Sequence, residues 1–129
     1  MPIKFTHKGD FRKTEGFLTT AKLIDIRKLL EHYGRRGVEE LKAATPEDSG
    51  KTADSWTYEI KTTNKGYSIT WTNTNENDGI PIVVLIQYGH GTGTGGYVPP
   101  FDFINPTMNP LFDDITEEVT YQLQRGGLR

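Results

Sequence analysis

Hydrophobic residues between positions 25 and 44 recur with the period of an α-helix, and charged residues fill the opposite side. The apolar stripe consists of Ile26, Leu29, Leu30, Tyr33, Gly37, Leu41 and Ala44. Asp25 is suited to cap the first turn, and Pro46 disfavours helical backbone at Thr45. The pattern therefore predicts a long helix over about 25–44. Gly34 and Gly37 lie inside it, and their small size predicts a bend or a close crossing with another helix or backbone.

The segment before this helix has a weaker pattern. Residues 1–12 are polar with scattered apolar positions, and we predict an extended arm for them. Apolar residues at helical spacing follow, and they predict a separate short helix over 13–23. These residues are Phe17, Leu18, Ala21 and Ile24.

Strict alternation of apolar and polar residues marks the region from about 55 to 73. The apolar positions are Trp56, Tyr58 and Ile60, then Tyr67, Ile69 and Trp71. A turn at Thr63-Asn64-Lys65-Gly66 separates the two runs. One apolar and one polar side per strand is typical of an antiparallel sheet with one wet face. We predict a hairpin whose tryptophans pack under the long helix.

A second helical stripe predicts a C-terminal helix over about 106–124. The stripe consists of Ile104, Met108, Leu111, Phe112, Ile115, Val119 and Leu123. Asp113, Asp114, Glu117 and Glu118 lie off the stripe, and we expect them to complement the helix dipole from the N-terminal half. Gly126-Gly127 is expected to end the helix.

The remaining segments are connections. Residues 47–54 are expected to form a turn and 73–79 a polar loop. Residues 80–86 are ambiguous, because β-branched content favours a strand whereas Asp78 and Pro81 favour a short helix. The glycine-rich stretch 89–100 predicts an irregular, flexible loop.

This order of elements predicts a single α+β domain over 1–129, with the helices packed on one face of a small antiparallel sheet. The chain has 129 residues, no cysteine, and no apolar run long enough to span a membrane. Disulfides and cysteine-based sites are excluded, and the basic N-terminus has no apolar stretch typical of a signal peptide. We expect a protein that is made and kept in the cytoplasm.

The charge is unevenly distributed. Residues 1–42 hold ten basic and six acidic residues, whereas residues 43–129 hold five and eleven. Opposite charges at the two ends favour head-to-tail packing of identical subunits. The simpler interpretation, which we prefer, is two solvated helix faces of opposite sign. The formal net charge of −2 argues against broad nucleic-acid binding.

Motifs that imitate catalytic or metal sites are incomplete. Gly50-Lys51-Thr52 resembles the end of a phosphate-binding loop, but Thr45 occupies the position of the first required glycine. The glycines after Tyr88 lack a βαβ context. The three histidines lack the spacing of a zinc site. We therefore predict no catalytic, cofactor or metal site and no enzymatic activity.

The aromatic residues of the hairpin could stack on bases, as they do on sheet-type RNA-binding proteins. The sheet segment supplies only Lys61 and Lys65 as cations, so packing in the core is the favoured role for these rings.

Three stretches together resemble a known family. They are Tyr33-Gly34-Arg35-Arg36-Gly37-Val38-Glu39-Glu40-Leu41 leading to Ala44-Thr45-Pro46-Glu47-Asp48-Ser49-Gly50, then Ser55-Trp56, then Tyr88-Gly89-His90-Gly91-Thr92-Gly93 running to Phe103-Ile104-Asn105-Pro106. This order and spacing is similar to the minor tail-component family of tailed bacteriophages and prophages. Its members are called tail-completion, tail-terminator or head–tail joining proteins. The resemblance spans about 25–123, and the longer glycine loop at 91–96 departs from the family pattern.

The resemblance implies a structural virion protein that forms a ring, commonly a hexamer, at the end of the tail tube. The implied partners are other copies of the chain, the tail tube protein and a head-completion or connector protein, with no membrane and no sequence-specific nucleic acid. The implied location is the tail or neck of the virion, after assembly in the host cytoplasm. In relatives the segment before Tyr-Gly is usually helical, which favours a short helix over 80–88.

Residues for subunit contacts follow from this interpretation. In the glycine loop and its flanks we expect contacts from Tyr88, Gly89, His90, Tyr97 and Phe101. Arg35 and Arg36 are expected to pair with the acidic helix of a neighbour. A head-side neck protein, a small nucleic-acid-binding module and a small hydrolase or transferase using His90 remain as alternatives.

Overall fold

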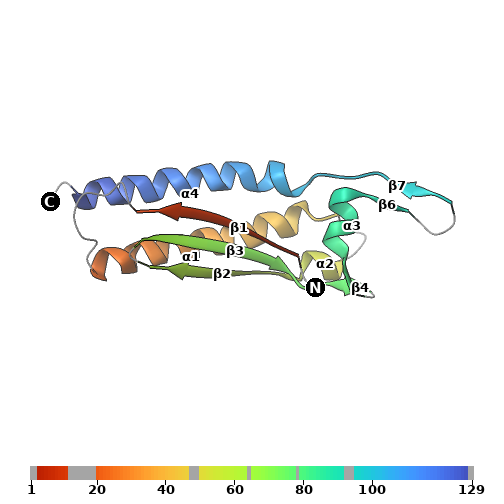
Figure 1. Cartoon of the computed structure of the whole chain (residues 1–129), viewed down its shortest axis with the longest axis horizontal. Coiled ribbons are helices and arrows are strands. Elements are labelled where there is room, and N and C mark those ends of the chain that lie inside the picture. Colours follow the sequence, from red (N-terminus) through yellow and green to blue (C-terminus); the bar gives the residue numbers. More distant parts are fainter. Residues whose placement is uncertain are drawn as a thin grey trace.

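The structure is a computed structural model that describes residues 3–11, 20–46, 50–63, 65–77, 79–91 and 95–127. The elements are β1 (Ile3–Asp10), α1 (Thr20–Ala44), α2 (Gly50–Ala53), β2 (Trp56–Thr62), β3 (Gly66–Asn73), β4 (Glu76–Asn77), β5 (Ile80–Pro81), α3 (Ile82–Tyr88), β6 (His90–Gly91), β7 (Tyr97–Val98) and α4 (Ile104–Gly127). The molecule is elongated, with α1 and α4 along its length and α3 and the β6–β7 pair at one end (Figure 1). Across the described ranges, no helix is long and apolar enough to cross a membrane.

The first strand belongs to the sheet. β1 pairs antiparallel with β3 over its whole length, from Ile3 opposite Asn73 to Asp10 opposite Gly66. The predicted extended arm over 1–12 is therefore wrong for residues 3–10. The alternation is weak in the sequence because His7 and Gly9 occupy positions on the side of the strand that is usually apolar.

β2 and β3 form the predicted hairpin, with Tyr58 opposite Trp71 and Ile60 opposite Ile69. The turn closes where the N–H of Thr63 donates to the carbonyl of Gly66 at 2.9 Å. The sheet order is β1-β3-β2, and both pairings are antiparallel.

Both long helices cover the same face of this sheet. α1 packs on β2 and β3, and α4 packs on α1 and reaches β1, where Phe112 stacks on His7 with ring centroids 4.8 Å apart. Both tryptophans are buried in this core, as predicted. The other face of the sheet is polar, and its residues are Lys4, Thr6, Lys8, Thr57, Glu59, Lys61, Ser68, Thr70 and Thr72. The α+β prediction, with a long N-terminal helix and a C-terminal helix, is confirmed.

Gly34 and Gly37 do permit a close approach, but the neighbours are aromatic rings of the sheet. A Cβ on Gly34 would overlap the ring of Tyr58, and a Cβ on Gly37 would overlap the ring of Trp71. Trp71 also donates its Nε1–H to the carbonyl of Gly34 at 3.1 Å. The two glycines therefore form a seat that lets the helix backbone lie directly on the sheet.

Several predicted boundaries need correction. α1 begins at Thr20, so Asp25 lies exposed inside the helix and does not cap it. Residues 13–19 of the predicted short helix lie outside the described residues, and 20–23 are continuous with α1 because Leu23 also packs on the core. The predicted end near Thr45-Pro46 is confirmed.

α4 is longer than predicted and includes Gly126-Gly127 instead of ending before them. Because it begins at Ile104, the four acidic residues from Asp113 to Glu118 lie near its middle. They are therefore too far from its first turn to complement the N-terminal dipole.

Two segments predicted as irregular contain short elements. Residues 50–53 form a helical turn, while 47–49 of the predicted turn lie outside the described residues. In the predicted loop at 73–79, β4 pairs with β5, placing Glu76 opposite Pro81. α3 confirms the helical alternative for 80–88, although it begins at Ile82 with Pro81 in extended conformation at the cap position.

Candidate interaction surface

A short two-stranded ladder projects from the end of the molecule between α3 and α4 (Figure 1). His90 pairs with Val98 and Gly91 with Tyr97. The predicted irregular loop over 89–100 is therefore wrong at these four positions, where backbone pairing makes the base regular. Residues 92–94 lie outside the described residues.

Gln87 fixes this projection to the body of the protein. The side chain is buried at the end of α3, and its Nε2 donates to Asp102 Oδ1 at 2.6 Å. Its Oε1 accepts the N–H groups of Phe103 and Ile104 at 3.3 and 3.4 Å. One amide thereby joins α3 to the first turn of α4, across the whole length of the projecting segment.

Asp102 completes this junction. Its Oδ1 accepts the backbone N–H of Asn105 at 3.1 Å, which satisfies a donor in the first turn of α4. The hydrogen bond from Gln87, followed by that from the Asn105 backbone, lowers the pKa of the Asp102 carboxyl. A second tie is the N–H of Phe101, which donates to the carbonyl of Ile86 at 2.9 Å. The segment therefore leaves and re-enters the body at two hydrogen-bonded points.

The anchored segment carries three large exposed aromatic side chains. Tyr88 is 67% exposed, Tyr97 is 64% and Phe101 is 55%, whereas the adjacent Phe103 is 3% exposed. Gly89 adopts a positive φ of 78° between Tyr88 and the ladder, a conformation that favours glycine. Four of the predicted contact residues, together with the backbone of His90, therefore lie on one projecting segment. We call Tyr88, Tyr97 and Phe101 the aromatic patch.

The two predicted arginines lie elsewhere, on α1. Arg36 is 3.2 Å from Glu40 and 3.6 Å from Asp114, and its guanidinium lies over the ring of Tyr33. The acidic helix that Arg36 contacts in this structure is thus α4 of its own chain. A pair between an arginine and the acidic helix of a neighbour stays a prediction. Arg35 is exposed and lines a groove of about 470 Å³ with Val38 and Tyr58 at the β2 edge.

The residues that resemble the end of a phosphate-binding loop have a structural role. Gly50-Lys51-Thr52 lies in α2, and the buried Thr52 hydroxyl accepts a hydrogen bond from Asn75 Nδ2 at 2.7 Å. The Thr52 carbonyl accepts a hydrogen bond from Asn73 Nδ2 at 2.8 Å. Among the residues that the structure describes, no group of three or more His, Cys, Asp or Glu residues is arranged to hold a metal ion.

His7 has a structural position that the sequence did not indicate. Its ring stacks on Phe112, and Nε2 lies 3.1 Å from Tyr67 Oη and 3.4 Å from Thr116 Oγ1. Burial lowers the pKa of this imidazole, and the nearby Asp113 carboxylate offsets part of that effect. Its position at the contact between β1 and α4 therefore favours the neutral imidazole.

A pH dependence of stability follows from the lowered pKa. Near pH 6.5, the ordinary value for histidine, the unfolded chain binds more protons at His7 than the folded protein does. We expect the free energy of unfolding to fall as the pH is lowered through this value. Urea unfolding at pH 8 and pH 5.5 measures it. His7→Phe, which keeps a ring against Phe112, should show a smaller loss, and an equal loss in both proteins would contradict the assignment.

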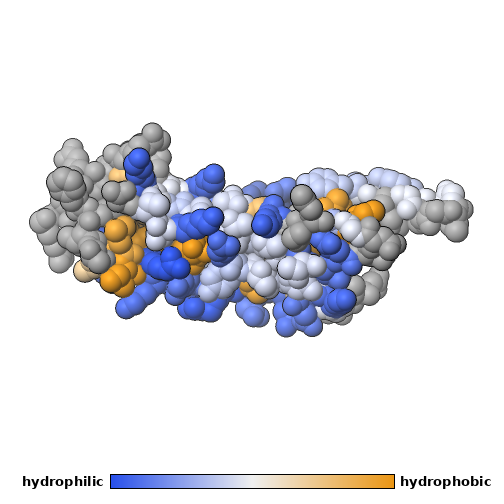
Figure 2. Space-filling model, turned by 60° about the horizontal axis from the view of Figure 1, so that its bottom comes forward, coloured by the Kyte–Doolittle hydropathy of each residue, from blue (hydrophilic) through white to orange (hydrophobic). Residues whose placement is uncertain are grey.

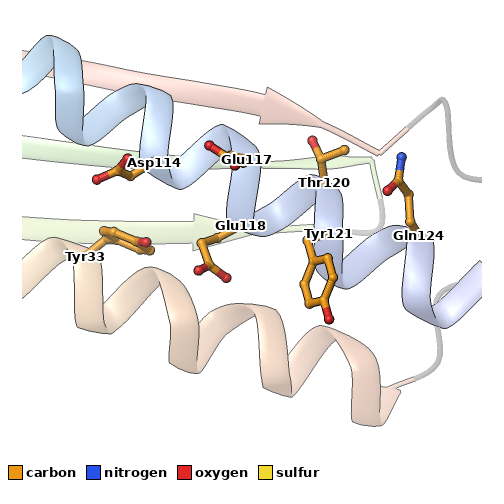
Figure 3. Close-up of a pocket in the computed structure, with 7 residues that line it drawn as sticks. All are labelled: Tyr33, Asp114, Glu117, Glu118, Thr120, Tyr121 and Gln124. Atoms are coloured by element: carbon orange, nitrogen blue, oxygen red, sulfur yellow. The ribbon is translucent and has the colours of Figure 1, made fainter.

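A groove of about 820 Å³ runs between α1 and α4 on the side of the helices away from the sheet (Figure 3). Its lining residues are Tyr33, Asp114, Glu117, Glu118, Thr120, Tyr121 and Gln124. Burial raises the pKa of Tyr33, and the carboxylates of Glu118 and Asp114 raise it further. Three carboxylates, those of Asp114, Glu117 and Glu118, line this groove, which we call the acidic groove.

Comparisons with protein-family models, with curated proteins and with solved structures each found no match.

Proposed function

We propose that this chain is a structural subunit that assembles with its own copies into a ring at the head–tail junction of a tailed phage or prophage. In this role it acts as a tail-completion or tail-terminator protein and has no catalytic activity. Its partners are further copies, the tail tube protein and a head-completion protein. The family resemblance supplies the phage context, and the aromatic patch on its anchored projection is the observation that carries self-assembly.

Exposed aromatic side chains and a rigid base on the projecting segment both favour association. Exposing three large aromatic side chains on one segment is unfavourable in water, and aromatic residues are enriched in buried parts of protein interfaces. The ties through Gln87 and Phe101 hold the base of the segment in place before binding, which lowers the entropy cost of association. A projection at one end of an elongated subunit gives a contact with different surfaces on the two partners, the kind that closes into rings.

The resemblance motifs also meet in space. Trp56 donates its Nε1–H to Thr45 Oγ1 at 2.9 Å, which joins the Thr-Pro motif to the Ser-Trp motif. Asn75 accepts the N–H of Ile82 at 3.1 Å, which continues the connection to α3 and the Tyr-Gly motif. The end of α1, α2 and α3 lie at the same end of the molecule (Figure 1), and these two hydrogen bonds join the Thr-Pro and Ser-Trp motifs and lead on to α3. Contacts that join the parts of the family pattern support a shared role for them.

Removing the aromatic patch tests the proposal. In the triple variant Tyr88→Ser, Tyr97→Ser, Phe101→Ser, we expect the concentration needed for assembly to rise by roughly tenfold or more, because buried aromatic anchors dominate interface energies. Light scattering and native mass measurement over a wide concentration range, with electron microscopy of protein mixed with tail tubes, give the readout. Ile24→Ser, which removes an apolar side chain that is 50% exposed on α1, is the control.

The results of this experiment distinguish a tail-side ring subunit from a head-side neck protein. Closed rings or capped tube ends that are lost in the triple variant support the proposal, provided circular dichroism shows that the variant is folded. A wild-type protein that stays monomeric and ignores tubes contradicts it. Binding to a head connector without any binding to tubes would favour the alternative of a head-side neck protein.

A further inference from the structure

The open face of the sheet is more basic than the hairpin alone indicates, because β1 adds to it. Lys4 and Lys8 of β1 lie on the same face as Lys61 of β2, and Lys8 and Lys61 flank Ser68 of β3 in one row. Lys8, Lys61 and Lys65 line a hollow of about 470 Å³ at the turn end of the sheet. Among the side chains that the structure describes in these rows, Glu59 is acidic, and it lies 3.8 Å from Lys61. We call Lys4, Lys8, Lys61 and Lys65 the basic face.

The acidic groove lies on the opposite side of the molecule, at the same level along its length. The hydroxyl of Thr116 on α4 lies 3.4 Å from Nε2 of His7 on β1. The next residues of each element, Glu117 and Glu118 on α4 and Lys8 on β1, are therefore at the same level along the molecule. Asp114 is paired with Arg36 of its own chain. Within the described part of the chain, Glu117 and Glu118 form no ion pair. Two patches of opposite charge therefore lie back to back on a two-layer molecule.

We infer that the basic face of one copy docks on the acidic groove of a second copy. This inference rests on the proposed self-assembly and adds, beside the aromatic patch, a second pair of surfaces that meet between copies. Because the patches are level and on opposite sides, stacking subunits face to back brings them together without a shift along the long axis. The contact joins different surfaces, so each copy offers one to each of two neighbours, and a rotation per contact that divides a full turn closes a ring.

Charge is the feature that selects this partner. In Figure 2 the hydrophobic residues form separate orange groups among blue ones, so no continuous apolar surface dominates the face shown. Complementary charge then sets orientation and speeds association. A nucleic acid is the less favoured occupant, because the aromatic residues of the three strands face the helices and give no stacking surface for bases.

Charge reversal of each patch tests the contact. We expect Lys8→Glu, Lys61→Glu to lose assembly at concentrations where the wild type forms rings, and Glu117→Lys, Glu118→Lys to do the same. Placing like charges opposite each other is strongly unfavourable, so the assembly concentration should rise by roughly tenfold or more. A one-to-one mixture of the two variants should assemble again, since each reversed patch then meets its complement. Raising the salt concentration should weaken wild-type assembly.

The control is Lys28→Glu, Lys51→Glu, which makes the same change in charge at exposed lysines of α1 and α2. Circular dichroism checks that every variant is folded. Folded variants that assemble like the wild type, or a mixture that fails to recover, overturn the assignment of these surfaces while the proposed function stands. A wild type that never assembles overturns both. Binding of a short DNA duplex that Lys8→Glu, Lys61→Glu abolishes, with assembly unchanged, overturns the assignment in favour of nucleic acid.

Discussion

Gly37→Val is expected to lower the free energy of unfolding by about 3 kcal/mol, the upper part of the usual range for overpacking a core. The first atom added at this position overlaps the ring of Trp71, with Cε2 at 2.7 Å and Cζ2 at 2.8 Å. That ring cannot move aside, because it is fully buried and lies between Phe5 and Phe112 at centroid distances of 5.9 and 5.7 Å. The Nε1 hydrogen bond to Gly34 fixes it further.

Helix propensity acts in the opposite direction but is too small to reverse the sign. Replacing glycine inside a helix gains at most about 1 kcal/mol, and less for a β-branched residue. The matched control is Gly50→Ala, where an added Cβ meets no atom within 4 Å and the change should be neutral or slightly stabilising. Urea denaturation followed by tryptophan fluorescence measures both variants. A Gly37→Val protein as stable as the control would show that α1 can move away from the sheet at little cost.

Gly34 and Gly37 show how much of the packing could be predicted from the sequence. Their position inside the predicted helix indicated a bend or a close crossing with another helix or backbone, and a close approach is present, to rings of the sheet. The pattern could not show which surface approaches, because a missing side chain carries no information about its neighbour. The rings of Tyr58 and Trp71 fill the space, and only the register between β2 and β3 places them there.

β1 illustrates the limit of alternation as a guide to strands. Phe5 gives an apolar inward position, but the next two inward positions hold His7 and Gly9. Residues distant in the sequence cover these two positions. The ring of Phe112 stacks on His7, and the ring of Tyr67 lies over Gly9. A local pattern cannot reveal a strand whose inward side is completed by residues from β3 and α4. The basic face was hidden for the same reason.

Some candidate contact residues have an environment that the local sequence indicates, whereas others depend on distant partners. Tyr88, Tyr97 and Phe101 are apolar residues next to glycines and prolines, where a chain has little means to bury them, and their exposure follows from that context. Arg36 lies on a helix face whose partner depends on how α4 packs, so its pairing with Asp114 could not be predicted. Gln87 was not identified because its role comes from hydrogen bonds to residues at least 15 positions away.

Asn73→Ala is expected to lower the free energy of unfolding by about 2–3 kcal/mol, because it leaves a buried donor without an acceptor. Asn73 is fully buried at the end of β3, and its Oδ1 accepts the backbone N–H of Asn75 at 3.0 Å. Its Nδ2 donates to the carbonyl of Thr52, which keeps a second donor in the N–H of Ser55 at 3.1 Å. The main loss is therefore at Asn75, with a smaller contribution from the missing bond to α2.

The same substitution should loosen one end of the molecule more than the rest. Asn75 also accepts the N–H of Ile82, the first residue of α3, so a displaced Asn75 releases the start of the helix that carries Tyr88. Hydrogen exchange should become faster in peptides covering 82–88 than in peptides covering the middle of α1. Asn109→Ala, at an exposed position of α4, is the control and should change stability by less than about 0.5 kcal/mol. Uniformly faster exchange along the chain would mean that Asn73 supports the core as a whole and not the base of the aromatic patch.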